Sequence, residues 1–379
     1  MKSFMETEYK LKIDPFASKV DISAPMAGRK KEKKAWDQII KQRAGQKGNS
    51  FNFIIGDYGL GKSLSLYSIC KEVGENQKEI VPIFITLLPE DSIRKFGLEF
   101  IQRIFDKFDV KEMKAVLSKV GKNDFDDLKE IMPEPANIFE RIKKGEKMAL
   151  DFITSDHVLD TKELKQLGVG RKLDSTDRAK DYLLAFLYLL KRGGFSSLLL
   201  AVDEVEYIFS QMRGSKISLA FNTLRGIHDL QQSHDKALKL GDIANMIFFF
   251  GISEDGWRRL TVDLQKREKS QGGPIQPFMD RKDNVITLEP LDKDETKELI
   301  ELRLSESRTT MGTISKKPLI PFSDDFVAYV FDLTKGRPRD IVRRCDTVLL
   351  EGLEQKIPLI TVSFAKKVYE SHGLFTEAK

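Results

Sequence analysis

A glycine-rich stretch carries the clearest chemical signal in this sequence. Gly56-Asp57-Tyr58-Gly59-Leu60-Gly61-Lys62-Ser63 fits the pattern G-x-x-x-x-G-K-[ST]. Its glycines let the backbone curl so that N–H groups point at phosphates, and a following helix adds its positive dipole end. Lys62 would place a charge on the β- and γ-phosphates, and the Ser63 hydroxyl could ligate Mg²⁺. The motif predicts a nucleotide-binding loop, with a purely structural glycine turn as the alternative.

Two carboxylates follow an apolar run further along the chain. Leu198–Val202 reads as a buried strand, and Asp203 and Glu204 come directly after it. Beside a phosphate-binding loop, the first acid would hold Mg²⁺ through water, because Mg²⁺ keeps much of its hydration shell. The second acid would accept a proton from the attacking water, so we expect Glu204 to be the general base. Glu206 is the alternative base.

The elements that must position these residues alternate between strand and helix. The phosphate loop lies between a predicted strand, Phe51–Ile55, and a predicted helix, Lys62–Val73. Further strands are predicted at Ile80–Leu88, Ser197–Val202, Asn245–Ile252 and Val285–Leu288. Residues 91–175 read as mostly helical, with helices at Ile93–Phe108, Val110–Val120, Asp124–Ile131, Ile138–Phe152 and Thr161–Leu167. Other helices are predicted at Lys30–Arg43, Arg178–Lys191, Ser215–Leu230, Asp292–Leu304, Ser323–Thr334, Arg339–Glu354 and Ser363–Ser371.

This order of elements predicts an α/β fold, in which a parallel sheet lies between helices and a small all-α domain follows. We expect three parts: a basic N-terminal segment at 1–48 that packs on the nucleotide site, an α/β domain at 49–290, and a helical lid domain at 291–379. The α/β domain would carry the helical stretch at about 91–175 as an insertion.

The combination of motifs resembles the AAA+ ATPases. A polar residue, Ser253, follows the strand that ends at Ile252 and matches the family's sensor 1 position, where it would orient the attacking water. The stretch Gly336-Arg337-Pro338-Arg339-Asp340 resembles the sensor 2 motif of the origin-recognition initiator branch. That resemblance implies that Arg339, or as an alternative Arg337, reaches the γ-phosphate, because a planar guanidinium suits phosphate oxygens.

Two further segments extend the resemblance. Ala27-Gly28-Arg29-Lys30-Lys31-Glu32 is similar to the segment that lies over the adenine in the initiator branch, which implies a nucleotide contact by Arg29. Lys30 departs from that branch, which has Glu in its place. The loop residues Asp57-Tyr58-Gly59 and the run Asp203-Glu204-Val205-Glu206 also look like ATP-binding proteins of BREX-type phage-defence systems and like transposition-regulator ATPases. The resemblance covers residues ~10–90 and ~180–350.

AAA+ proteins complete their site with an arginine from the neighbouring subunit, which stabilises charge in the transition state. Arg281, shortly before the strand Val285–Leu288, stands in the usual place, and Arg258, Arg259 and Arg267 are alternatives. Such an arginine implies a homo-oligomer.

The expected site comprises two groups of residues. The catalytic group is Glu204, Asp203, Ser253, Arg339 and Arg281. The nucleotide-binding group is Gly56, Asp57, Tyr58, Gly59, Leu60, Gly61, Lys62, Ser63, Leu64 and Arg29, and the Mg²⁺ ligands are Ser63 and Asp203. The expected cofactors are ATP and Mg²⁺.

Composition excludes several classes of protein. The 379 residues are 41% hydrophobic and 32% charged, which excludes a disordered or low-complexity chain. No apolar run approaches the ~20 residues of a membrane span, and the first residues contain no signal peptide. Only two cysteines occur, which excludes a disulfide framework and favours a cytoplasmic protein. Positive charge is concentrated in residues 1–50, where 12 Lys and Arg face 6 Asp and Glu.

Two functions are compatible with these features. In the first, an AAA+ ATPase hydrolyses Mg-ATP to assemble or remodel an oligomer that acts on DNA or a DNA-processing complex, with DNA held by backbone contacts. In the second, a nucleotide-dependent signalling or scaffold switch of the STAND type binds a protein partner through residues 91–175 without DNA.

Overall fold

The computed structural model describes residues 3–17, 26–87, 95–155, 158–210, 215–263, 275–308 and 318–374. Its contacts divide the chain into two compact units. We call Ala35–Ile55 with Ile69–Ile286 the sheet unit, and Met1–Lys34 with Gly56–Ser68 and Thr287–Lys379 the helical unit. The helical unit therefore combines three stretches that are far apart in sequence.

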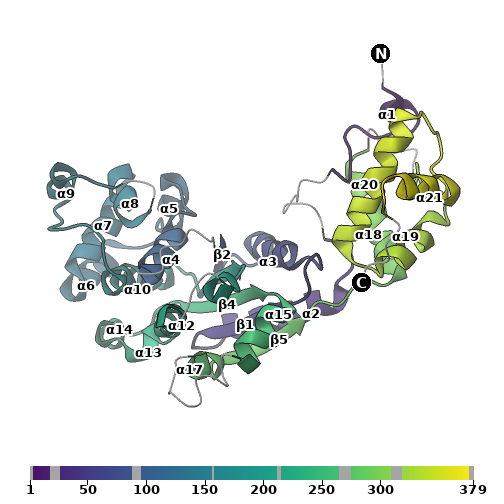
Figure 1. The fold of residues 1–379 in the computed structure, drawn as a ribbon. Helices are drawn as coiled ribbons and strands as arrows, with labels where there is room; N and C mark the ends of the chain where they lie inside the picture. The colour runs from purple at the N-terminus through teal and green to yellow at the C-terminus, as the bar shows by residue number, and fades with distance from the viewer. Residues whose placement is uncertain are drawn as a thin grey trace. The chain divides into compact units, whose positions relative to one another are not determined.

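The sheet unit contains one five-stranded sheet in the order β2-β3-β4-β1-β5 (Figure 1). The strands are β1 (Ser50–Ile55), β2 (Ile80–Thr86), β3 (Ser197–Asp203), β4 (Asn245–Ile252) and β5 (Lys282–Thr287). The pairs β2·β3, β3·β4 and β1·β4 are parallel, which confirms the predicted parallel α/β fold. Ile55 pairs with Ile252, and Val202 pairs with Phe250. The carboxyl ends of β1, β3 and β4 therefore lie at one edge of the sheet.

Aromatic side chains fill the core against the sheet. Phe51 lies 5.0 Å from Phe248 and 5.1 Å from Phe250 between ring centroids, both in edge-on geometry. Phe278, from the short helix α17 (Ile275–Met279), lies 5.0 Å from Phe51. All three β4 phenylalanines, Phe248 to Phe250, are fully buried. The run is core packing, because β4 is buried on both faces in the middle of the sheet.

Six helices form the stretch between β2 and the helix that precedes β3. They are α4 (Phe96–Phe105), α5 (Val110–Val116), α6 (Lys122–Ile131), α7 (Pro133–Lys144), α8 (Lys147–Ile153) and α9 (Thr161–Leu167). The single helix predicted at 138–152 is wrong, because α7 ends at Gly145, whose φ of +92° is the left-handed C-cap conformation. Two carbonyl groups of the last turn, those of Arg141 and Ile142, accept the hydrogen bond of the Gly145 N–H.

Helix α10 (Thr176–Arg192) joins these helices to the sheet. Every residue from Tyr182 to Leu190 is buried, so this part of the helix is covered on all sides. It packs against α4 and α7 as well as against β3. One continuous hydrophobic core therefore runs from the helical stretch 96–167 into the sheet.

The other helices of the sheet unit are short, apart from three. Helix α2 (Lys30–Ala44) and helix α3 (Lys62–Asn76) each begin in the helical unit and continue into the sheet unit, and α12 (Ser215–His228) lies between β3 and β4. The short ones are α11 (Tyr207–Ser210), α13 (Leu230–Ser233), α14 (Asp235–Leu240), α15 (Glu254–Arg258) and a π-helical turn at Arg259–Asp263.

The helical unit contains α1 (Phe4–Thr7), α18 (Lys293–Glu306), α19 (Phe326–Thr334), α20 (Pro338–Glu354) and α21 (Val362–Ser371). The predicted helical C-terminal region is confirmed. Tyr9, Leu11 and Phe16 of the N-terminal segment are fully buried among these helices. The Tyr9 hydroxyl donates to the carbonyl of Ile357 at 2.6 Å, so residues 9–16 belong to the core of this unit.

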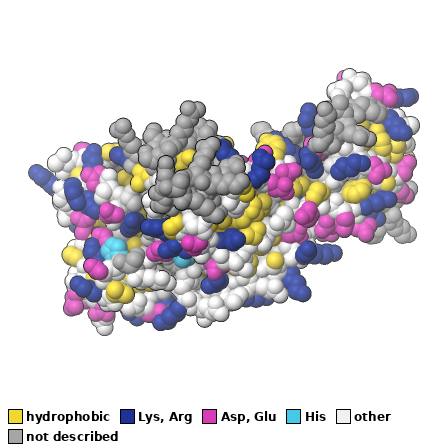
Figure 2. Space-filling model, turned by 60° about the horizontal axis from the view of Figure 1, so that its bottom comes forward, with side chains coloured by type: hydrophobic (Ala, Val, Ile, Leu, Met, Phe, Trp, Pro, Cys, Tyr) yellow, Lys and Arg dark blue, Asp and Glu magenta, His cyan; other side chains and the backbone are white. Residues whose placement is uncertain are grey.

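The surface shows no single-sign field on the face drawn in Figure 2, where basic and acidic side chains are interspersed. Among the described residues, none of the helices has the length and apolar character that crossing a bilayer requires.

Candidate nucleotide-binding site

The phosphate loop follows β1 directly and leads into α3, as predicted. Gly59 and Gly61 have φ values of +87° and +93°, a region that residues with side chains avoid. Gly56 approaches the chain after β5 closely, since a Cβ atom there would lie 3.1 Å from the Cβ of Leu288. Glycine is thus required in this loop by conformation at Gly59 and Gly61 and by space at Gly56.

Lys62 lies over the loop at the first residue of α3. Its ammonium donates to the carbonyl oxygens of Gly56 at 2.9 Å and Asp57 at 3.3 Å. Both of these partners are neutral carbonyls, which a triphosphate could replace as the stronger partner of a cation. Ser63 and Leu64 follow within the first turn of α3 and are partly exposed.

Arg29 ties the N-terminal segment to the phosphate loop. The side chain is almost completely buried, and its Nη2 donates to the carbonyl of Leu60 at 2.8 Å. Its Nη1 donates to the carbonyl of Glu289 and contacts Glu32. Gly28 and Arg29 both have positive φ, and Glu295 of α18 accepts the Arg29 N–H at 3.0 Å. These contacts hold the Arg29 guanidinium against the main chain of the loop at Leu60.

Helix α20 begins on the phosphate loop. Its N-cap residue, Arg337, has no side-chain cap, and Pro338 stands at the first helical position. The N–H of Arg339 donates instead to the carbonyl of Gly59 at 3.2 Å. The Arg339 guanidinium lies 4.4 Å from the ring centroid of Tyr58, and Arg337 lies 3.6 Å from the carboxylate of Asp57. The expected sensor residues therefore reach the loop itself.

Asp203 and Glu204 lie at the carboxyl edge of the sheet. Asp203 is the last residue of β3 and is almost fully buried, and its carbonyl accepts the N–H of Leu87 at 3.1 Å. Glu204 has a φ of +59°, in the left-handed region that few residues with a side chain adopt. The chain turns sharply at Glu204, and its carbonyl accepts the N–H of Tyr207 at 3.0 Å.

Ser253 follows β4 at the same edge. Its hydroxyl accepts the N–H of Gly256 at 3.1 Å and so caps α15. Its own N–H donates to Oε1 of Glu206 at 3.2 Å, while Oε2 of Glu206 is buried with no hydrogen-bond partner among the described residues. Glu206 thereby links the chain after Asp203 and Glu204 to the sensor 1 position, and it contacts the main chain of Ser253.

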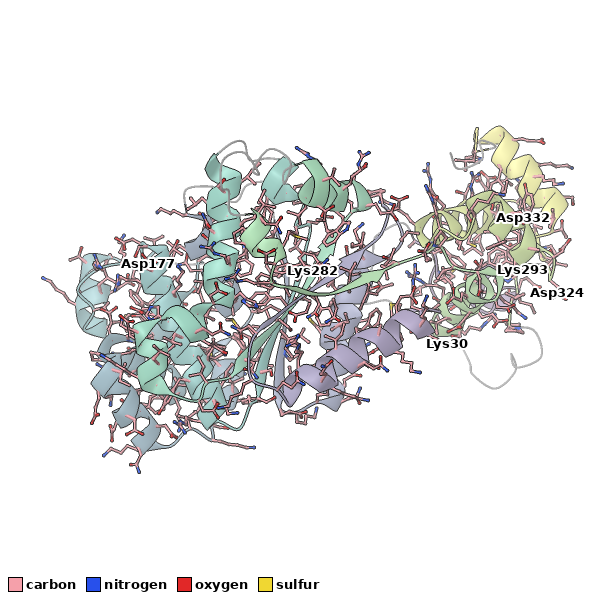
Figure 3. All side chains as sticks on the ribbon, turned by 90° about the horizontal axis from the view of Figure 1, so that it is seen from below. Lys30, Asp177, Lys282, Lys293, Asp324 and Asp332 are labelled. Atoms are coloured by element: carbon pink, nitrogen blue, oxygen red, sulfur yellow. The ribbon has the colours of Figure 1, made fainter. Side chains whose placement is uncertain are left out.

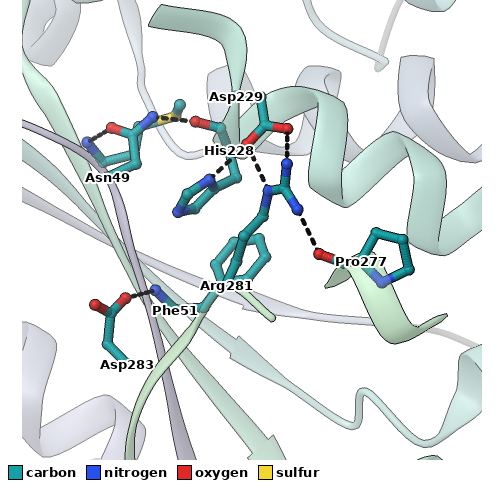
Figure 4. A network of polar contacts seen from close by, with 8 residues as sticks. Asn49, Phe51, His228, Asp229, Pro277, Arg281 and Asp283 are labelled. Atoms are coloured by element: carbon teal, nitrogen blue, oxygen red, sulfur yellow. Dashed lines mark hydrogen bonds and ion pairs between the residues drawn. The ribbon is translucent and has the colours of Figure 1, made fainter. Parts of the chain in front are cut away.

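Arg281 directly precedes β5, at the end of the sheet where β1 begins, and Figure 4 shows its polar contacts. Asp283 and Asn284, which follow it, bond to Phe51 and Asn52 near the start of β1. Arg281 pairs with Asp229, its Nε donating at 2.6 Å, and it also donates to the carbonyl of Pro277. Burial raises the pKa of Asp229, but hydrogen bonds from Arg281 and His228 outweigh it and leave that pKa lowered. Within this chain, Arg281 is a structural ion-pair partner of Asp229.

The remaining candidates take different places. Arg258 pairs with Asp255 at 3.3 Å in an exposed turn, Arg259 begins the π-helical turn, and Arg267 lies outside the described residues. No cluster of three or more His, Cys, Asp or Glu side chains able to hold a metal exists in the described ranges.

Sequence reasoning missed several contacts of the loop. Glu295 and Glu298 of α18 accept the N–H groups of Arg29 and Gly28, and neither residue carries a motif. The stack of Arg339 on Tyr58 was also missed. The sequence signal for it is an aromatic residue inside the loop together with an arginine at the start of the lid helix.

Comparison with known proteins gives one family match. The family of BREX system ATP-binding proteins, BrxC/D, matches residues 78–356. This range includes Asp203, Glu204, Ser253, Arg281 and Arg339 and begins after the phosphate loop. No curated protein matches the chain by sequence.

Two solved structures are similar at low identity. Cdc6p from Pyrobaculum aerophilum is 12% identical, with a TM-score of 0.47 over 95% of this chain and 72% of that one. Orc1 of Aeropyrum pernix, solved in complex with DNA, is 11% identical, with a TM-score of 0.49 over 96% of this chain and 70% of that one. At these scores neither likeness bears on what this chain does.

Proposed function

The chain belongs to the BrxC/D family of BREX system ATP-binding proteins, and on this premise we propose that it binds and hydrolyses Mg-ATP to drive the assembly or remodelling of an oligomer that acts on DNA or a DNA-processing complex. The proposal extends the family's ATP binding to hydrolysis, to a side-by-side oligomer and to a DNA-related target.

The observation that carries the proposal is the gathering of three arginines on one phosphate loop. Arg29 bonds to Leu60, Arg337 pairs with Asp57, and Arg339 contacts Tyr58 and Gly59. They come from the N-terminal segment and from the lid helix α20, both within the helical unit. A glycine turn with a purely structural role has no use for a lysine and an adjacent lid arginine, whereas bound phosphates would use both.

The residues divide the chemistry among them. The loop amides and Lys62 would bind the phosphates, and Arg339 would contact the terminal one. Glu204 would hold the attacking water and take its proton, with Ser253 orienting that water. Ser63 and Asp203 would hold Mg²⁺, which neutralises charge on the phosphate oxygens.

Calorimetric titration tests the binding step. We expect Mg-ATP to give saturable heats with the wild-type chain and much weaker binding with Lys62→Ala. The matched control is Lys78→Ala, because Lys78 is a surface lysine whose ammonium donates to the carbonyl of Gly74 outside the loop. Flat heats with the wild-type chain at millimolar ATP would refute the proposed function.

Contact with DNA would come from exposed lysines on helix α2. Lys30, Lys31, Lys34 and Lys41 are all exposed on this helix, which Figure 3 shows beginning at Lys30.

ATP turnover with and without duplex DNA, at two salt concentrations, separates a DNA-directed ATPase from a signalling switch that acts on a protein partner. Stimulation that weakens with salt supports DNA as the target, because phosphate contacts release counterions. Slow turnover indifferent to DNA supports the signalling switch.

A further inference from the structure

Tyr58 is the most exposed residue of the phosphate loop, and its ring has a specific neighbour. The side chain is 73% exposed. The Arg339 guanidinium lies over this ring, 4.4 Å from its centroid. The Tyr58 ring therefore lies outside the core and against Arg339.

Arg339 is fixed to the loop at both its main chain and its side chain. Its N–H donates to the Gly59 carbonyl, and its Cβ lies 3.1 Å from where a Cβ on Gly59 would stand. A guanidinium over a ring is attracted through its face, so its N–H donors lie in the plane around it and stay available. Among the described residues, no acceptor bonds to these donors.

Such an arrangement prepares an arginine for an anion. A long arginine side chain loses substantial rotamer entropy when it is ordered by a ligand. A ring that already restricts the side chain removes part of this cost, while the in-plane donors remain free for phosphate oxygens. The neighbouring ion pair of Arg337 with Asp57, at 3.6 Å, holds the same helix turn on the same loop.

We propose that Tyr58 is a positioning residue, whose ring holds the Arg339 guanidinium over the phosphate loop with its donors directed to the terminal phosphate of a bound nucleoside triphosphate. This inference rests on the proposed function and adds a specificity element to it. Tyr58 selects for a third phosphate through Arg339 and makes no contact of its own with the chemistry.

The test is a double-mutant cycle on nucleotide affinity. The variants are Tyr58→Ala, Arg339→Ala, the double variant and the control Tyr58→Phe, which keeps the ring and loses only the hydroxyl. The affinities for ADP and for a non-hydrolysable ATP analogue are measured by calorimetry on the full chain. Tyr58 is exposed, so its truncation leaves the core intact.

We expect Tyr58→Ala to weaken the ATP analogue about 2- to 5-fold, the range of an exposed cation–π contact, and to leave ADP within twofold. Tyr58→Phe should match the wild type, and Tyr58→Ala should add nothing in the Arg339→Ala background. Equal losses for both nucleotides, a Tyr58→Phe as weak as Tyr58→Ala, or the same loss without Arg339 would each overturn the proposal.

A tighter ATP analogue in Tyr58→Ala would overturn it as well, since the ring would then compete with phosphate for the arginine. A wild-type chain that binds neither nucleotide would refute the proposed function itself. That outcome is distinct from a chain in which both nucleotides bind and Tyr58 has no effect on their ratio.

Discussion

The main-chain N–H of Arg339 donates to the carbonyl oxygen of Gly59 across 3.2 Å, so a carbonyl of the phosphate loop caps helix α20. Arg337 stands at the N-cap position, but a guanidinium has no acceptor and its side chain cannot cap the helix. Loop and helix are therefore joined through their backbones, and a change in either one affects the other.

Gly59→Ala tests this junction. Alanine at a φ of +87° is strained by roughly 1–2 kcal/mol, and its methyl group would stand 3.1 Å from the Cβ of Arg339. We expect a lower melting temperature and at least a 10-fold loss of nucleotide affinity. Gly48→Ala is the matched control, because Gly48 also has a positive φ, +111°, but nothing lies within 4 Å of its added Cβ. Equal effects in the two variants would assign the loss to backbone strain alone.

Glu204→Gln separates binding from hydrolysis. We expect nucleotide affinity to stay within a few-fold of the wild type while turnover falls by about 10²–10⁴, because glutamine cannot accept the proton. Steady-state phosphate release and calorimetry measure the two properties. Glu206→Gln is the comparison, since it keeps a carbonyl oxygen for the N–H of Ser253 and should change turnover only a few-fold. A larger loss in Glu206→Gln than in Glu204→Gln would reverse the assignment of the base.

Mixing experiments test Arg281 as an arginine that acts on the neighbouring subunit. Arg281→Ala and Glu204→Gln should each be inactive alone, and their mixture should regain part of the activity. In a mixed oligomer, some interfaces combine the intact Arg281 of a Glu204→Gln subunit with the intact Glu204 of an Arg281→Ala subunit. Phosphate release across a range of mixing ratios is the measurement.

The control for this experiment is Asp229→Asn. It breaks the ion pair with Arg281 but leaves the arginine in place. We expect Asp229→Asn to lower thermal stability and to keep activity. If it is as inactive as Arg281→Ala, the role of Arg281 is structural within its own subunit.

Asp14 makes the stability of the helical unit depend on pH. Burial, with a further contribution from the neighbouring carboxylate of Asp346, raises the pKa of Asp14 from 3.8 to about 6. The folded protein therefore holds a proton that the unfolded chain releases at lower pH. The resulting stabilisation is complete below about pH 4 and is lost as the pH rises through about 6.

Asp14→Asn should remove this dependence. Asparagine keeps an oxygen for the N–H of Phe16, which Oδ1 of Asp14 accepts at 2.8 Å. We expect the variant to be more stable than the wild type by about 1 kcal/mol above pH 7, allowing for partial exposure, and no more stable at pH 4. Thermal unfolding between pH 4 and 8 measures the difference, and a constant difference across this range would contradict the assignment.

Much of the fold was predictable because its strongest signals are local. The buried strand Asn245–Ile252 was predicted at its observed bounds, since seven consecutive apolar or glycine residues follow Asn245, and such a short run is typical of a central strand. The phosphate loop was predictable because its backbone conformation requires glycine at fixed positions, which leaves a recognisable spacing in the sequence. The break at Gly145 was missed, because apolar spacing continues across it from Ile138 to Phe152 and only the left-handed C-cap ends the helix.

Contacts between distant segments were beyond the reach of sequence patterns. The residues Tyr9, Leu11 and Phe16 lie in a stretch that reads as irregular, yet they are fully buried among the C-terminal helices. The role of Glu295 in holding Arg29 depends on the placement of α18 beside residue 29, which no local propensity encodes. Arg281 was expected in the usual place, but its partner Asp229 belongs to a segment more than fifty residues earlier.

The unbroken burial of residues 182–190 in α10 limits how this protein can be dissected. The helix contributes its apolar surface to the stretch 96–167 on one side and to β3 on the other. Excising that stretch would leave Tyr182, Phe186 and their neighbours facing water, and we expect the shortened chain to aggregate. Partner-binding studies of this region are therefore better designed around surface substitutions in the whole chain than around an isolated fragment.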